Sequence, residues 1–111
     1  MVNKFNSERY TWGSNSTAWV LQDDEHLSVK QELMPPGSRE MLHYHQYATQ
    51  FFYVLSGEAT IHLEQELILL KSNEGLTVPK LKRHFISNES SVDLEFLVIS
   101  QPSTNNDRIN I

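Results

Sequence analysis

The 111-residue chain contains no cysteine, so neither disulfides nor thiolate metal sites nor a cysteine nucleophile can contribute to it. Long apolar runs are also missing, and we expect no segment that spans a bilayer. Basic residues are few, because 9 lysines and arginines face 14 aspartates and glutamates, for a formal charge of −5. Nucleic-acid-binding domains usually have a basic surplus, so neither nucleic acid nor a membrane surface is an expected partner.

What is present is the composition of a folded domain. Apolar residues make up 39% of the chain and aromatic residues 10%, well above the apolar-poor range of disordered segments. The length suits a single domain, residues 1–111, that buries a hydrophobic core. The first residues, MVNKFNSERYTW, contain no apolar stretch typical of a secretion signal, which predicts a cytoplasmic protein.

Turn-forming residues divide the chain into short pieces, and the strongest break is the sequence PPGS at residues 35–38. Between the breaks, pieces such as 59–63 alternate apolar and polar residues with the period of a β-strand. The pieces predicted as strands are 18–21, 27–34, 51–55, 59–63, 67–70, 76–78, 83–87 and 94–99. The segment 38–47 also favours strand over helix, while the polar tail 102–110 is expected to be frayed.

Short strands at regular spacing, with no helical periodicity, predict an all-β sandwich or barrel. A closed antiparallel barrel or a jelly roll is the favoured form, because it leaves few exposed strand edges in a small domain.

Three of the five histidines are candidates for a metal site. His43 and His45 are two residues apart, so on a strand both imidazoles point to the same face. Gln50 begins an aromatic strand-like run, and His84 lies in a distant strand-like piece. Three neutral imidazoles and one amide oxygen can hold a divalent transition metal with open positions. A histidine pair is equally compatible with two half-exposed polar residues, so the spacing alone leaves metal binding open.

The order of these residues resembles the two sequence motifs of the cupins. Residues 37–57 read G-x5-H-Y-H-x4-Q-x6-G, which is similar to the first motif, G-x5-H-x-H-x3,4-E-x6-G. Residues 75–88 read G-x3-P-x4-H-x3-N, which resembles the second motif, G-x5-P-x-G-x2-H-x3-N. The resemblance implies a small single-domain cupin, whose fold is a double-stranded β-helix or jelly-roll barrel.

The resemblance also implies a ligand set. Carried over by position, the cupin metal ligands are His43, His45, Gln50 and His84, which implies one divalent transition metal per chain, such as Fe, Mn, Ni or Zn. The chain departs from the pattern in having Gln50 where the family usually has glutamate, and Leu81 in place of a glycine. A neutral amide leaves the bound cation with more positive charge, so we expect weaker metal binding and a preference for an anionic ligand.

Strand alternation extends the expected pocket. If His43 and His45 face inward along an unbulged strand, Met41 and Arg39 do so as well. Arg39 could then bind a carboxylate through two hydrogen bonds, and Phe52 would contribute to the apolar wall. We therefore predict Arg39, Met41 and Phe52 as substrate-binding residues; a surface arginine and ordinary core side chains are the alternatives. No catalytic residue can be assigned from the sequence.

Three functions are compatible with these features, and whether the protein is an enzyme stays open. The resemblance to small cupins of the mannose-6-phosphate isomerase-like kind implies isomerase or epimerase chemistry on a small sugar-derived or organic-acid substrate. The alternatives are an Fe(II)-dependent dioxygenase and a binding module that holds a small ligand without turnover. Aromatic residues expected on outward faces, among them Phe51 and Tyr53, favour a homodimer.

Overall fold

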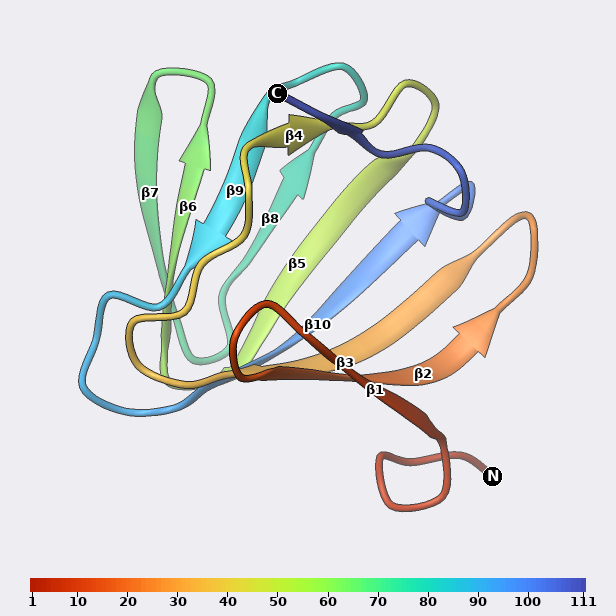
Figure 1. Ribbon diagram of the computed structural model, residues 1–111, viewed down its shortest axis with the longest axis horizontal. Helices are drawn as coiled ribbons and strands as arrows, with labels where there is room; N and C mark the ends of the chain where they lie inside the picture. Colours follow the sequence, from red (N-terminus) through yellow and green to blue (C-terminus); the bar gives the residue numbers. More distant parts are fainter.

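The computed structural model describes all 111 residues, and they form two antiparallel sheets that face each other, without any helix (Figure 1). The strands are β1 Glu8–Trp12, β2 Ser16–Asp23, β3 Ser28–Met34, β4 His43–Tyr44, β5 Thr49–Ser56, β6 Glu58–Leu63, β7 Glu66–Lys71, β8 Gly75–Val78, β9 His84–Ser87, β10 Leu94–Gln101 and β11 Ile109–Asn110. The larger sheet has the order β1-β2-β3-β10-β5-β8 and the smaller one β11-β4-β9-β6-β7. The expected all-β jelly roll is therefore confirmed. No helix of the length and apolarity needed to cross a membrane is found.

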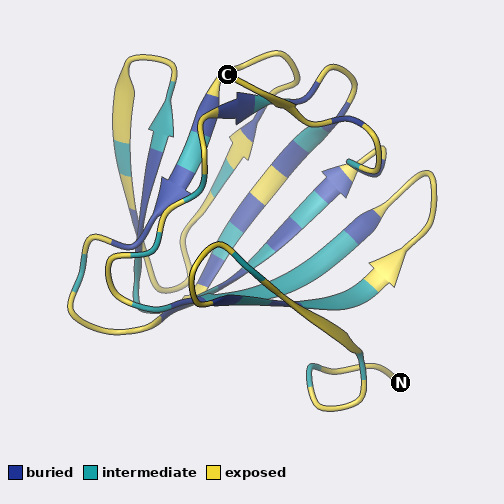
Figure 2. Cartoon of the chain, viewed as in Figure 1, coloured by how far each residue is buried: buried dark blue, intermediate teal, exposed yellow.

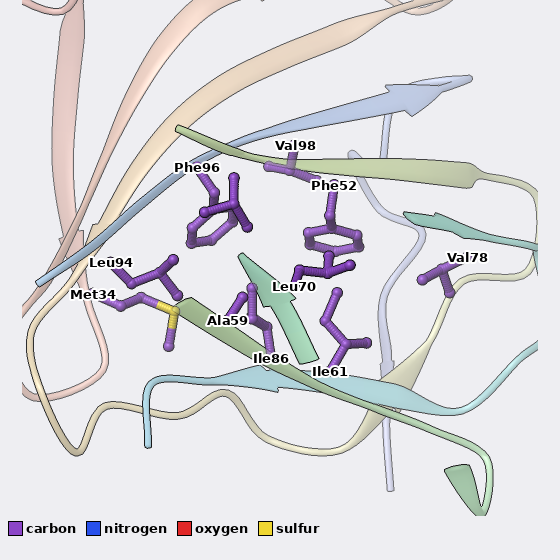
Figure 3. Packing of buried hydrophobic residues seen from close by; sticks show 11 residues of the cluster. Met34, Phe52, Ala59, Ile61, Leu70, Val78, Ile86, Leu94, Phe96 and Val98 are labelled. Carbon is purple, nitrogen blue, oxygen red and sulfur yellow. The ribbon is translucent and has the colours of Figure 1, made fainter. Parts of the chain in front are cut away.

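A single hydrophobic core fills the space between the two sheets. Along β10, Leu94, Phe96 and Val98 are buried while the residues between them are partly exposed, as the alternating colours of Figure 2 show. Eleven buried residues form the core, and they are drawn in Figure 3: Met34, Phe52, Val54, Ala59, Ile61, Leu70, Val78, Ile86, Leu94, Phe96 and Val98. Since strands of both sheets contribute, burial of this apolar surface holds the sheets together.

The observed strands overlap those predicted from alternation, with two differences. The strand β1 was not predicted, because almost all of its residues are exposed and it lacks a buried face of its own. It forms because its backbone pairs antiparallel with β2. The segment 38–47 contains no helix, as expected, but it holds only the two-residue strand β4 and an isolated bridge between Arg39 and Ser87.

The C-terminal tail is ordered, so the expectation that it frays is wrong. Ser103 and Asp107 are buried, and β11 pairs with β4, where Ile109 is opposite Tyr44. In Figure 1 this dark-blue segment runs beside β4. Hydrogen bonds, rather than an apolar face, attach the tail to the rest of the molecule. A polar sequence can therefore be ordered here.

The two sequence motifs hold each other at one end of the barrel. The N–H group of Gly37 donates to the carbonyl of Asn88 at 2.9 Å, and the N–H group of Asn88 donates to Ser38 at 2.9 Å. The buried side chain of Asn88 donates to the carbonyls of Met34 and Val92, at 2.8 Å each. The last residue of the second motif therefore fixes the loops on either side of it.

Gly57, between β5 and β6, has a φ of 86°, and a Cβ atom at this position would collide with the carbonyl oxygen of Asp93. We expect Gly57→Ala to lower the free energy of unfolding by more than about 2 kcal/mol, because backbone strain and the collision add. Gly13 has a φ of 59° with no atom within 4 Å of an added Cβ, so Gly13→Ala is the matched control. Urea denaturation measures both, and equal losses would contradict the close approach at Gly57.

Candidate metal centre

Three histidines converge between the sheets. β4 supplies His43, the loop after it supplies His45 and β9 supplies His84, and His43 and His84 are directly paired across the two strands. One nitrogen from each ring lies within 4.8 Å of the others. The three side chains are almost completely buried, with exposed fractions of 1%, 3% and 1%. Residues that are distant in the sequence thus form one compact group of possible metal ligands.

A main-chain carbonyl orients each imidazole ring. The Nδ1–H groups donate from His43 to Met41 (2.8 Å), from His45 to Asp107 (2.6 Å) and from His84 to Lys82 (2.8 Å). A carbonyl oxygen can only accept, so the proton of each neutral ring is on Nδ1 and the lone pair is on Nε2. This is the arrangement that metal-binding histidines usually have.

Two of the rings, those of His43 and His84, are also kept neutral. Burial lowers the pKa of His43 and that of His84 to about 4 in each case, because the charged imidazolium form loses its hydration inside the barrel. At pH 7 both rings therefore keep a free lone pair, which a cation can accept.

Gln50 completes the group from the larger sheet. Its side-chain nitrogen lies 3.1 Å from the hydroxyl of Ser100, and its oxygen lies 3.1 Å from Nε2 of His84. Since His84 carries its proton on Nδ1, two lone pairs face each other there, and a cation between them would remove the repulsion. Nε2 of His45 is buried without any hydrogen-bond partner. Both observations fit a donor set that holds a divalent metal.

His43, His45 and Gln50 line a cavity of about 520 Å³. Of the predicted substrate-binding residues, Phe52 lines this cavity, is 4% exposed and has its ring centroid 6.3 Å from that of His84. Met41 also lines it but is 63% exposed. Arg39 reaches the rim, with its guanidinium 4.7 Å from the ring centroid of Phe85. The substrate contacts of these three residues stay predictions.

Asp107 is a residue of the site that the sequence did not reveal. Its carboxylate accepts the main-chain N–H groups of Gln46, Tyr47 and Ala48 at 2.7, 3.1 and 3.0 Å. Its carbonyl accepts the Nδ1–H group of His45. The tail thereby fixes the loop that carries a histidine ligand. An aspartate among polar tail residues has no pattern that identifies such a role.

Four charged residues of the cavity were also missed: Glu40, Arg108, and Lys30 and Glu32, the last two on β3. Lys30 and Glu32 show why. In the sequence their alternation with Val29 and Leu33 indicates a solvent-facing side of the strand. In the structure this is the side that faces the cavity.

Leu81 occupies the glycine position of the second motif, and the structure shows what the change does. Its φ is 72°, in the left-handed region that favours glycine. Its N–H group donates to the carbonyl of His45 at 2.7 Å. The loop of the second motif therefore supports the loop that carries His45, although Leu81 has a strained backbone conformation.

An antiparallel double-stranded β-helix with a buried histidine group facing a cavity defines the cupin class of proteins. The cupin domain family matches residues 30–100, and the chain belongs to this family.

The chain is similar to proteins from several organisms. It is 30% identical over 87 residues to MJ1618, an uncharacterized protein of Methanocaldococcus jannaschii, covering 75% of this chain and 70% of that protein. It is 32% identical over 66 residues to an oxalate-binding protein of Thermotoga maritima, of which it spans only 54%, with 60% of this chain covered. The structure of an RmlC-like cupin from Shewanella frigidimarina superposes with a TM-score of 0.84 at 16% identity, covering 95% of this chain and 92% of that one. This last likeness confirms the fold alone.

We expect Gln50→Glu to tighten metal binding by about tenfold or more, because a carboxylate is a stronger ligand for a divalent cation than an amide. The added negative charge should weaken binding of an anion such as oxalate to the metal-loaded protein. Titration with Zn²⁺ against a chelating dye measures the first effect and calorimetry the second. Gln65→Glu, an exposed residue, is the control for added charge. No change in either affinity would contradict a ligand role for Gln50.

Removing the carboxylate of Asp107 should loosen the loop that carries His45. For Asp107→Ala we expect metal affinity to fall by about 10- to 100-fold, the usual cost of losing a group that supports a ligand. Zn²⁺ affinity and the melting temperature without metal are measured side by side, with Asp93→Ala, an exposed aspartate, as control. A lower melting temperature with unchanged Zn²⁺ affinity would show that Asp107 serves stability alone.

Proposed function

We propose that this cupin holds one divalent transition metal per chain on His43, His45, Gln50 and His84, and that it acts on a small anionic substrate of the organic-acid or sugar-derived kind. The observation that carries the proposal is the buried Nε2 of His45, which has no partner and faces two further imidazoles that are held ready to donate lone pairs. The related oxalate-binding protein supports an organic acid as the ligand class.

A divalent metal on neutral ligands would supply Lewis acidity for isomerase- or epimerase-like chemistry, such as that of mannose-6-phosphate isomerase-like cupins. The chain's own residues hold the imidazoles in one orientation, and Phe52, Phe96 and Val98 provide an apolar wall that keeps water from part of the cavity. In such surroundings electrostatic attraction between the site and an anion is stronger than in bulk water.

We also infer that the protein is a cytoplasmic homodimer. Phe51 and Tyr53 lie stacked on the outer face of β5, with ring centroids 6.3 Å apart, and Phe51 is 38% exposed. Exposed aromatic side chains that lie together are typical of protein interfaces, which supports association of two copies.

The test of the proposed function is the metal content of the purified protein by plasma mass spectrometry. We expect near-stoichiometric metal, lost in His43→Ala and kept in His26→Ala, whose side chain is 85% exposed. The loaded protein should bind oxalate in calorimetry, and the metal-free protein should not. Absence of metal even after reconstitution would overturn the proposal, and iron together with oxygen consumption would replace it by a dioxygenase.

A further inference from the structure

β3 directs two charged side chains into the cavity. Lys30 and Glu32 alternate with the buried Ser28 and Met34 at the two ends of the strand, so all four share its inner face. Both charged residues line the same cavity as the histidines. Gln50 and these two residues belong to the larger sheet, whereas His43 and His84 belong to the smaller one.

Lys30 carries a charge that has no ionic partner in the protein. Lys30 and Glu32 form no ion pair, and the ammonium of Lys30 lies 5.5 Å from the ring centroid of Tyr10. A half-buried charge without a partner is costly. The ammonium of Lys30 has an aromatic ring but no carboxylate beside it, so it can take an anion from the cavity as its partner.

The other charged residues near Glu32 are already engaged. The carboxylate of Glu40 accepts the N–H group of Ile86 at 3.0 Å and lies 3.5 Å from the guanidinium of Arg108. Arg108 donates in addition to Asn110 at 3.0 Å. Lys30 and Glu32 are therefore the charged groups of this wall that remain available to a ligand.

The strand register gives the separation between this pair and the metal ligands. Gln50 pairs with Ser100, which pairs with Ser28, so these three residues form one row across β5, β10 and β3. Lys30 and Glu32 follow two and four residues further along β3. They lie two strands away from Gln50, about 10 Å across the sheet, and about 7 and 13 Å further along the strand direction. Gln50, Lys30 and Glu32 all line the cavity, so a ligand that joins the histidine end to this pair spans several carbon atoms.

We propose that Lys30 and Glu32 form an anion subsite opposite the histidines, and that the ligand is a small bifunctional acid. One end, a pair of oxygen atoms, lies at the histidine group. The other end is a carboxylate that pairs with the ammonium of Lys30 and accepts a hydrogen bond from the carboxyl group of Glu32. The inference rests on the proposed function, and it names the substrate class.

The protonation of Glu32 agrees with this role. Burial, followed by the negative charge of Glu40, raises the pKa of Glu32 to about 8, against the opposing effects of Lys30, of the indole of Trp12 and of Arg108. The remaining titratable groups that line the cavity are the phenol of Tyr10, the guanidinium of Arg39 and the imidazoles of His43 and His45. Below pH 8 the carboxyl group of Glu32 keeps its proton and can donate to a carboxylate, while above pH 8 it is charged and repels one.

The experiment compares matched pairs of 2-oxo acids in calorimetric titrations of the Zn²⁺-loaded protein at pH 7. 2-Oxoglutarate and 2-oxoadipate carry a distal carboxylate, whereas 2-oxopentanoate and 2-oxohexanoate end in a methyl group at the same length. We expect at least tenfold tighter binding of the diacid in one or both pairs. Lys30→Met should remove this preference without changing the affinity for the monoacids, and Lys80→Met, at an exposed lysine, should keep it.

A second variant tests the hydrogen bond from Glu32. Glu32→Gln keeps a donor that cannot ionise, so the preference for the diacid should persist from pH 7 to pH 9, where the unmodified protein loses it. Equal affinities for monoacid and diacid at both lengths, or a preference that survives Lys30→Met, would overturn the subsite while leaving the proposed function intact. Binding of neither kind of acid would instead overturn the proposed function, and the subsite with it.

Discussion

The orientation of three imidazole rings by main-chain carbonyls is the constraint on which the metal centre depends. Each ring donates its Nδ1–H group to a backbone oxygen, and these oxygens belong to Met41, Lys82 and Asp107. Because the three segments are far apart in the sequence, the lone pairs converge only when the barrel has closed. Binding of a cation to this group would therefore be coupled to folding, since a cation that prefers this arrangement stabilises the folded chain.

One edge of the smaller sheet depends on polar contacts, whereas its other strands and the larger sheet are held by the apolar core. β4 and β11 have two residues each, too few to bury an apolar face. The carboxylate of Asp107 compensates for the missing apolar contacts, because it accepts hydrogen bonds from three successive N–H groups in the loop after β4. Hydrogen bonds to a charged acceptor are stronger than neutral ones, so a short tail can fix the loop without hydrophobic burial.

The cavity has two unlike walls. On one side the donors are neutral, because burial lowers the pKa of His43 and His84. On the other, Lys30 and Glu32 face the cavity, and burial raises the pKa of Glu32. Desolvation thus favours the uncharged form of imidazoles and carboxyl group alike. Lys30, Arg39 and Arg108 then supply the positive charge of the cavity, which is the basis for proposing an anionic ligand.

Much of the fold and the histidine group could be predicted from the sequence alone. Strand alternation is a local property, so it identified the strands of the core, and the spacing of His43, His45, Gln50 and His84 identified the residues that come together. Three features depended on tertiary structure: the pairing of the exposed strand β1, the order of the polar tail, and the direction of Lys30 and Glu32. Alternation shows that two residues share a face of a strand, but only the facing sheet decides whether that face meets solvent, core or cavity.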